Sequence, residues 1–288
     1  MTGRVAVVTD STAYLPPDLV AAHGLTVVPL QVVVGSQAYA EGAGIDGARV
    51  AAALRAWEPV STSRPSPTDF AKAYLAAAEA GADGVVSVHL SGEISGTVQS
   101  ARLAAAQVGE RDGFPVDVVD SRSLGMGLGY AALAAAQAAA GGADLAAVGE
   151  AARDRARRTV VYFSVDTLEH LRRGGRIGAA QALLGSALAI KPLLALVDGR
   201  IVPREKVRTT GRAVARLEEL CAEAATAAGG GPVHLAVHHL AEPQRAADLV
   251  ARLRHRVPLA AEPVLSEVGA VVGAHVGPGM LGVVVAPS

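Results

Sequence analysis

The sequence predicts a two-domain α/β protein in which the first domain is built on a parallel sheet and the second on a mixed sheet. Three observations support this prediction. The 288 residues, 51% of them hydrophobic, suffice for two cores. In the first half, short apolar strands alternate with helical segments, which is typical of a parallel sheet buried on both faces. In the second half, Asp198-Gly199 separates two β-rich segments and predicts an antiparallel hairpin.

Runs of β-branched residues and helix-start signals define the elements of the first half. Prolines at positions 16 and 17 favour the first turn of a helix, because proline lacks the N–H that this turn leaves unpaired. We predict strands over 5–8, 25–34, 83–90 and 116–119, and helices that begin at Pro16-Pro17 and cover 45–56, 96–108 and 124–140.

The second half combines the hairpin with isolated strands and helices, which indicates a mixed sheet. We predict strands over 160–164, 193–197, 201–208, 233–237, 262–268 and 281–286, and helices over 166–173 and 209–228. An arginine-rich helical stretch, 146–158, lies between the halves. The predicted domains are therefore residues 1–155 and 156–288.

Composition argues against several classes of function. A formal net charge of −1 gives no global attraction to nucleic acid or an anionic membrane, and 3% aromatic residues do not support base stacking. The single cysteine, Cys221, can form no intramolecular disulfide and is expected in the core. The histidines, including His238-His239, lack a metal-ligand spacing with carboxylates. Neither a signal-peptide pattern nor an 18-residue apolar run is seen, so we expect a cytoplasmic protein.

Polar residues cluster where predicted strands end, which is where parallel α/β sheets bind ligands. The four clusters are residues 10–12, 62–67, 91–97 and 120–123. Each also fits a simpler role, since Ser, Thr and Asp are common helix N-caps. Four clusters expected on one sheet edge nevertheless favour a polar pocket mouth.

The segment Ser95-Gly96-Thr97 is the most suggestive, because it opens a helix just after a strand. Glycine allows close approach of a ligand to the backbone, and a helix N-terminus favours an anion. No Gly-Lys-Ser/Thr follows, so a small anion such as a carboxylate fits better than a triphosphate. Later in the chain, His275 precedes Gly277-Pro278-Gly279, and we interpret it as a functional histidine in a turn between strands rather than on a helix face.

Together these motifs resemble the DegV family over nearly the whole chain. The resemblance is carried by Thr9-Asp10-Ser11-Thr12 with Leu15-Pro16, Thr62-Ser63-Arg64-Pro65-Ser66-Pro67, Leu90-Ser91 through Ser95-Gly96-Thr97, Phe163, Leu168-Glu169-His170-Leu171-Arg172-Arg173-Gly174-Gly175-Arg176-Ile177, Lys191-Pro192-Leu193-Leu194, Glu267-Val268-Gly269 and His275-Val276-Gly277-Pro278-Gly279.

The resemblance implies a fatty-acid-binding protein of the fatty acid kinase B-subunit type, which is not catalytic alone. Such a protein holds a long-chain fatty acid of about 14 to 18 carbons, such as palmitate or oleate, in a buried tunnel. It presents the carboxylate to a separate kinase subunit that makes an acyl phosphate for phospholipid synthesis. ATP and Mg²⁺ belong to that subunit, and the binding protein needs no cofactor or metal of its own. Transient membrane contact is compatible with this function, and nucleic acid is not an expected partner.

The resemblance also assigns roles to individual residues. The carboxylate is expected to meet Thr62, Ser95 and His275. The supporting residues at the pocket mouth are Ser11, Arg64, Gly96, Thr97, Ser121 and Gly277, and the candidate kinase-docking residues are Arg172, Arg173, Arg176, Arg204 and Arg208. This chain departs from the family at the mouth, with Arg64 in place of a common Gln, Val98 in place of a common Tyr, and an added charge at Glu93. The mouth is therefore expected to differ in electrostatics or specificity.

Two other functions stay open at this point. One is a carrier or sensor of another small lipid or carboxylate without a kinase partner. The other is a serine hydrolase, because Ser95, Asp120 and His275 follow the chain order of α/β-hydrolase triads. The Gly-x-Ser-x-Gly elbow of those enzymes is missing, which argues against the hydrolase.

Overall fold

The computed structural model describes residues 3–183 and 190–288. The chain forms two compact units, one made of residues 1–31 and 63–157 and the other of residues 32–62 and 158–288. Each unit has its own sheet. The division differs from the predicted continuous domains 1–155 and 156–288, because residues 32–62 pack with the second unit.

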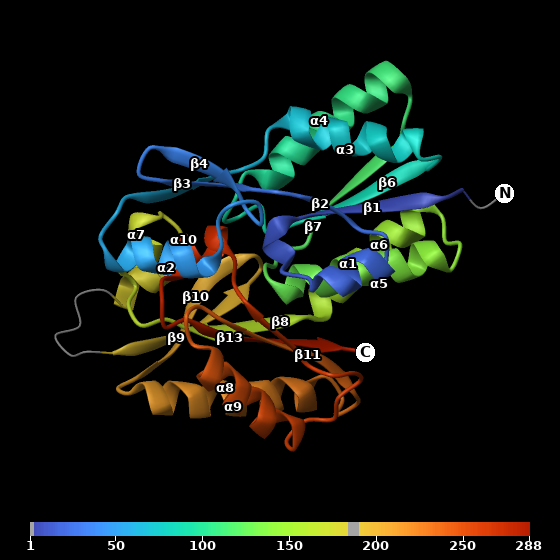
Figure 1. Cartoon of the computed structure of the whole chain (residues 1–288). Helices are drawn as coiled ribbons and strands as arrows, with labels where there is room; N and C mark the ends of the chain where they lie inside the picture. The colour runs from blue at the N-terminus through green and yellow to red at the C-terminus, as the bar shows by residue number, and fades with distance from the viewer. Residues whose placement is uncertain (1–2, 184–189) are drawn as a thin grey trace. The chain divides into compact units, whose positions relative to one another are not determined.

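The first unit is built on a four-stranded parallel sheet in the order β2-β1-β6-β7 (Figure 1). The strands are β1 (Val5–Asp10), β2 (Thr26–Val28), β6 (Gly84–His89) and β7 (Val116–Asp120). Every residue of β6 is buried. A strand of this kind reads as a continuous apolar run because helices cover both faces of a parallel sheet.

Helices lie on both faces of this sheet (Figure 1). They are α1 (Pro17–Ala22), α3 (Pro67–Glu79), α4 (Thr97–Asp112), α5 (Met126–Ala140) and α6 (Leu145–Arg158). On one face, Phe70 and Tyr74 of α3 and Ala101 of α4 pack against Val8 and Val85. On the other face, α5 is buried over most of its length up to Ala136, as expected for a helix that is apolar all round.

The second unit is built on a six-stranded mixed sheet in the order β10-β9-β8-β13-β11-β12. The strands are β8 (Val160–Ser164), β9 (Lys191–Val197), β10 (Arg200–Val207), β11 (Val233–His239), β12 (Val264–Glu267) and β13 (Leu281–Pro287). The predicted hairpin is confirmed, because Val197 pairs antiparallel with Arg200 and both turn residues have positive φ, 49° at Asp198 and 81° at Gly199.

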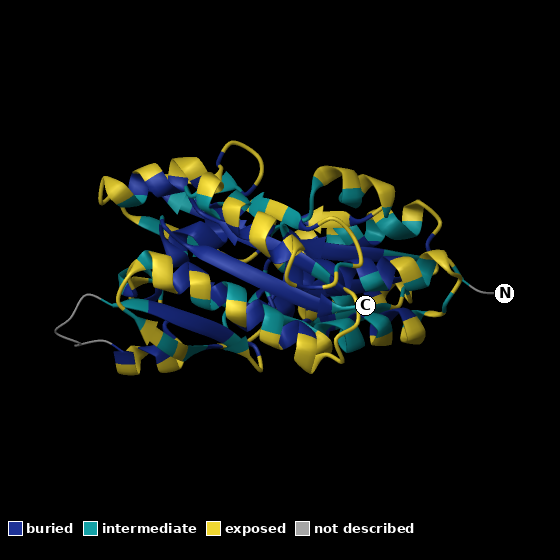
Figure 2. Ribbon diagram, turned by 90° about the horizontal axis from the view of Figure 1, so that it is seen from below, coloured by how far each residue is buried: buried dark blue, intermediate teal, exposed yellow. Residues whose placement is uncertain are grey.

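Two long helices, α8 (Thr210–Ala227) and α9 (Pro243–Arg254), share a core with this sheet. Leu217 and Cys221 of α8 and Leu249 of α9 pack there, so the prediction that Cys221 is a core residue is confirmed. In Figure 2 the strands are mainly dark blue, and yellow is concentrated on helices and loops.

The rest of the second unit joins residues 32–62 to later segments. Its elements are a three-stranded sheet of β4 (Gln37–Ala40), β3 (Gln31–Val34) and β5 (Val60–Ser63), and the helices α2 (Gly47–Arg55), α7 (Glu169–Arg173) and α10 (Ala270–Val276). The backbone N–H of Val271 on α10 donates to Glu41, and Gly47 at the start of α2 lies against the backbone of Val268. Helix α10 therefore packs on the segment that the chain inserts between β2 and α3.

One predicted strand is wrong in its extent. The run 25–34 forms two strands, because β2 pairs with β1 in the parallel sheet whereas β3 lies between β4 and β5. Pro29 and Leu30 separate them, and proline cannot donate to a strand ladder. The prediction did not include β4, β5, α3, α9 or α10.

The more deeply buried of the two buried histidines of β11, His238, makes stability depend on pH. His238 is 3% exposed, and burial lowers the pKa of its ring from 6.5 to about 4. Below pH 6.5 the unfolded chain therefore binds a proton that the folded chain does not, so stability is complete above pH 6.5 and falls as the pH drops toward 4. We expect a loss on the order of 1 kcal/mol per pH unit for each such histidine, measured by urea unfolding at pH 7.5, 6 and 5.

The variant His238→Asn is the matched control, because it removes the titrating ring and keeps a polar atom near Ser266, the partner of Nδ1 at 2.9 Å. Its free energy of unfolding should change less between pH 6.5 and 5 than that of the parent. Parallel curves for the two proteins would contradict the assignment.

Candidate functional site

Three of the four predicted polar clusters meet at the carboxyl edge of the parallel sheet in the first unit. The N–H of Ser91 donates to the carbonyl of Ser123 at 2.9 Å, and the N–H of Gly125 donates to the carbonyl of Thr12 at 2.9 Å. The loops that follow β1, β6 and β7 are therefore hydrogen-bonded to one another. The fourth cluster begins on β5, so Thr62 belongs to the sheet of the second unit and not to this edge.

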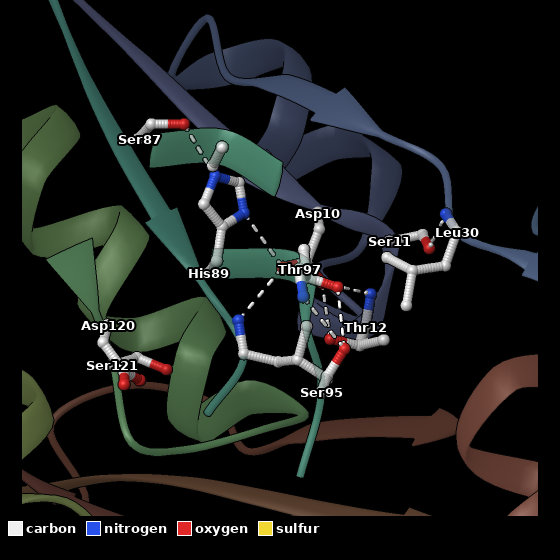
Figure 3. Close-up of polar contacts among 12 residues, drawn as sticks. Asp10, Ser11, Thr12, Leu30, Ser87, His89, Ser95, Thr97, Asp120 and Ser121 are labelled. Atoms are coloured by element: carbon white, nitrogen blue, oxygen red, sulfur yellow. Dashed lines mark hydrogen bonds and ion pairs between the residues drawn. The ribbon is translucent and has the colours of Figure 1, made fainter. Parts of the chain in front are cut away.

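Ser95 and Thr97 lie together at the N-terminus of α4. The two hydroxyl oxygens are 2.8 Å apart, and the N–H of Thr97 donates to Oγ of Ser95 at 3.2 Å (Figure 3). The guanidinium of Arg64 lies directly against Gly96, where any Cβ would overlap it. The N-terminal dipole of α4 and the charge of Arg64 both favour an anion beside Ser95.

Ser11 and Ser121 hold loops in place. Oγ of Ser11 accepts from the N–H of Leu30 at 3.0 Å, and Oγ of Ser121 accepts from the N–H of Ser123 at 3.1 Å. Both contacts are typical of side chains that stabilise turns. The role of these serines at a pocket mouth stays a prediction.

Thr62 and His275 form a pair within the second unit. Oγ1 of Thr62 lies 2.8 Å from Nε2 of His275, although 213 residues separate them in sequence. Burial, with a smaller contribution from the positive charge of Arg176, lowers the pKa of His275 to about 4, so its ring is neutral at pH 7. The prediction that His275 is not on a helix is wrong, because it occupies the last turn of α10.

Close backbone packing explains the glycines around this pair. A Cβ at Gly174 would overlap Nδ1 of His275, and a Cβ at Gly277, which has φ of 72°, would overlap the ring of His170. Gly174 ends α7 and Gly277 ends α10. Only glycine lets these two helix ends approach the histidines so closely.

The predicted docking arginines differ in their surroundings. Arg172 and Arg173 both bind the carboxylate of Glu169, at 2.8 and 2.7 Å, and these hydrogen bonds lower the pKa of Glu169 to about 2. Arg176 donates to the carbonyl of Gly174 at 2.7 Å. Arg204 lies on β10 and Arg208 follows it, and both are exposed.

The sequence prediction missed Trp57. This residue is the only tryptophan of the chain, is 73% exposed, and has a positive φ of 59°. The guanidinium carbon of Arg173 lies 4.8 Å from the centre of its ring, a cation–π contact. A bulky residue with positive φ is strained, and exposed strain of this kind is more common at functional surfaces. A lone tryptophan in an aromatic-poor sequence was the available signal.

The residues of the alternative hydrolase triad are engaged elsewhere. Ser95 bonds to Thr97, His275 bonds to Thr62 through Nε2, and the carboxylate of Asp120 accepts from the N–H groups of Gly92 and Arg122. In a hydrolase triad the histidine bonds to both the serine and the acid. These contacts show the ordinary N-cap and turn chemistry of Ser and Asp.

Neither a metal-binding cluster nor a membrane-spanning helix is found among the described residues. Within residues 3–183 and 190–288, no group of three His, Cys, Asp or Glu side chains could hold a metal ion. No helix in this part of the chain is long and apolar enough to cross a membrane.

The family model, the sequence relatives and the solved structures that match this chain all belong to one family. The family model described as "Uncharacterised protein, DegV family" matches residues 4–288. A DegV domain-containing protein of Streptomyces coelicolor is 56% identical over 285 residues, which cover 99% of each chain. Among solved structures, a fatty-acid-binding DegV family protein from Thermus thermophilus has a TM-score of 0.91 and 37% identity, covering 99% of this chain and 100% of its own.

A second solved structure agrees with the first. DegV from Bacillus subtilis, described as a fatty acid binding protein, has a TM-score of 0.88 and 34% identity, again covering 99% of this chain and 100% of its own. The predicted fold class, a parallel-sheet unit followed by a mixed-sheet unit, is confirmed by these likenesses. With a family match over nearly the whole sequence and relatives well above 30% identity, the chain belongs to the DegV family.

Proposed function

We propose that this protein binds a long-chain fatty acid and presents its carboxylate to a separate ATP-dependent kinase. The observation that carries the proposal is the Thr62–His275 pair, a neutral imidazole 2.8 Å from a hydroxyl, in a chain whose relatives from T. thermophilus and B. subtilis bind fatty acids. The proposed carboxylate-binding residues are Thr62 and His275 of the second unit and Ser95 of the first.

The acyl tail would supply most of the affinity. Transfer of a methylene group out of water yields about 0.8 kcal/mol, so fourteen methylenes yield roughly 11 kcal/mol before ordering costs. The carboxylate must then be hydrogen-bonded, because a buried charge without partners is strongly unfavourable. Small polar groups at the mouth are sufficient for that task.

The protonation of His275 suggests how the pair would bind a carboxylate. Among the described residues, the buried Nδ1 has no hydrogen-bond partner, so a proton on Nδ1 would leave a buried N–H unsatisfied. We therefore place the proton on Nε2, where it is donated to Oγ1 of Thr62. The hydroxyl proton of Thr62 is then free to be donated to a carboxylate oxygen.

Neutral donors suit a carboxylate that has to react. In the proposed reaction, a carboxylate oxygen attacks the γ-phosphorus of ATP, the acyl phosphate forms, and ADP leaves. ATP and Mg²⁺ would be held by the kinase. A hydroxyl donor leaves lone pairs of the carboxylate available, whereas a bidentate guanidinium would occupy both oxygens. With its low pKa, His275 carries no charge of its own, and its single ring proton, donated to Thr62, orients the Thr62 hydroxyl toward the carboxylate.

The kinase would dock on a surface made by Trp57, Arg172 and Arg173. Tryptophan and arginine are enriched in binding hot spots, and here they are stacked on each other and exposed. The same helix, α7, ends at Gly174 against His275, so a protein bound there lies next to the proposed carboxylate site. Arg176, Arg204 and Arg208 remain further candidates for docking.

The first test is direct identification of a bound lipid. We expect native mass spectrometry of the protein, purified from its expression host, to show one fatty acid of about 14 to 18 carbons that denaturation and extraction release. The double variant Thr62→Val/His275→Leu should bind added palmitate at least about 10-fold more weakly, since the Thr62 donor and the imidazole that orients it are both lost. A parent protein that is empty and takes up neither palmitate nor oleate would refute the proposed function.

A second test concerns the close approach at Gly174. In Gly174→Ala the new methyl group must displace His275, so palmitate affinity should fall about as far as in His275→Leu. Gly211→Ala is the matched control, because a Cβ at Gly211 has open space around it and helix α8 should gain stability. Equal palmitate affinity in Gly174→Ala and the parent, measured by calorimetry, would show that His275 does not need its observed position.

A third test uses Trp57 as its own reporter. Because Trp57 is the only tryptophan and is exposed, its emission should shift to the blue when a kinase bearing no tryptophan covers it. Trp57→Ala and Arg173→Ala should each slow acyl phosphate formation at low kinase concentration without changing palmitate affinity. Arg111→Ala, which removes an exposed arginine of α4 in the first unit, is the control. Unchanged rates in both variants would exclude this surface as the docking site.

A further inference from the structure

We propose that His89 is a positioning residue for Ser95, acting through a fully buried chain of hydrogen bonds that ends on Asp10. The inference rests on the proposed function, in which Ser95 binds the ligand carboxylate. The chain runs Tyr74, Ser87, His89 and Asp10, and each of these residues has no exposed surface. Figure 3 shows His89 between Ser87 and Asp10.

The hydrogen bonds run in one direction. The hydroxyl of Tyr74 donates to Oγ of Ser87 at 2.9 Å, and Oγ of Ser87 lies 2.6 Å from Nε2 of His89. Nδ1 of His89 lies 3.0 Å from Oδ2 of Asp10. A carboxylate only accepts, so Nδ1 carries the proton and Nε2 accepts from Ser87. A neutral histidine therefore satisfies every contact in the chain.

Asp10 joins the ends of two neighbouring strands. Its Oδ1 accepts from the N–H and the hydroxyl of Thr12, at 3.0 and 2.5 Å, which fixes the turn after β1. Its Oδ2 accepts from the N–H of Leu90 at 3.0 Å, just after β6. Nδ1 of His89 is the second donor to Oδ2. The ring of Phe70 packs edge-on against the ring of His89, with 4.8 Å between the ring centres. Loss of His89 would leave a buried carboxylate with one donor fewer.

Ser95 depends on the strand end that Asp10 holds. The residue after Leu90 is Ser91, whose carbonyl accepts from the N–H groups of Ile94 and Ser95 at 3.2 and 3.1 Å. The hydroxyl of Ser91 accepts from the N–H of Glu93 at 3.2 Å. The turn that carries Ser95 is thus closed on Ser91, one residue beyond the N–H that Asp10 binds.

The same geometry is not a catalytic triad. Ser87, His89 and Asp10 have the order of contacts that serine hydrolases use, but Ser87 is wholly buried in β6 beneath α3. Its hydroxyl already accepts from Tyr74 and bonds to His89. A substrate carbonyl cannot reach it, so the chain serves to hold the strand end.

The experiment measures position and headgroup selection separately. Hydrogen exchange of the ligand-free protein is compared for the parent, His89→Leu and Ser87→Ala. In His89→Leu we expect the amides of Leu90 and Ser95 to exchange at least about 10-fold faster, while amides of β11 in the second unit are unchanged. Ser87→Ala keeps the ring and should give a smaller change at the same amides, and it decides the matter if His89→Leu does not fold.

Headgroup selection is read as the ratio of the Kd for hexadecanol to the Kd for palmitate. His89→Leu should lower this ratio about 10-fold with little change for hexadecanol, and it should have no further effect in a Ser95→Ala background. A merely structural role would weaken both ligands equally. Unchanged exchange at Leu90 and Ser95 in the variants overturns the inference. A parent protein that binds neither ligand refutes the proposed function, and the exchange data still decide whether His89 positions Ser95.

Discussion

The buried carboxylate of Asp10 is the constraint around which the edge of the first unit is organised. A charge with no exposed surface is tolerated only if protein groups replace its water, and here those groups come from Thr12, His89 and Leu90. The three donors come from three places in the chain. Thr12 lies in the turn after β1, His89 is a buried side chain of β6, and Leu90 is the first residue after β6. The need to hydrogen-bond the Asp10 carboxylate therefore fixes where the loops after β1 and β6 begin. The loop after β7 is fixed in turn, because Ser123 and Gly125 are hydrogen-bonded to those two loops.

In the second unit, close packing rather than a buried charge positions the polar groups of the proposed site. Gly174 and Gly277 bring two helix ends against His275 and His170, and burial keeps His275 neutral. The two units thus prepare polar groups in different ways. The first uses an ionised buried group to order hydroxyls at a helix N-terminus. The second uses two glycines, whose lack of a side chain allows the imidazole of His275 to pack beside Thr62.

The sequence predicted the fold class and most elements because alternating apolar runs and the Asp198-Gly199 turn are local signals. It could not reveal that residues 25–34 divide between two sheets, since both halves of that run have the same β propensity. His275 was misplaced because the short helix α10 has no N-cap side chain and reads as an apolar loop. The pairing of Thr62 with His275 and of Asp10 with His89 arises only from tertiary structure, and His89 looked like one more residue of a buried strand.

The insertion of residues 32–62 has a consequence for how the chain is made. The chain passes between units after residues 31, 62 and 157, so neither unit is a continuous stretch. During synthesis, α2 and the strands β3 to β5 emerge early. The second unit is complete only when α10 and the central strand β13 have also been made, more than two hundred residues later. All residues of the first unit are present once α6 has been made. The segment 32–62 still lacks the later residues against which it packs, so its apolar surface stays uncovered. Chaperone demand during translation should therefore centre on that waiting segment.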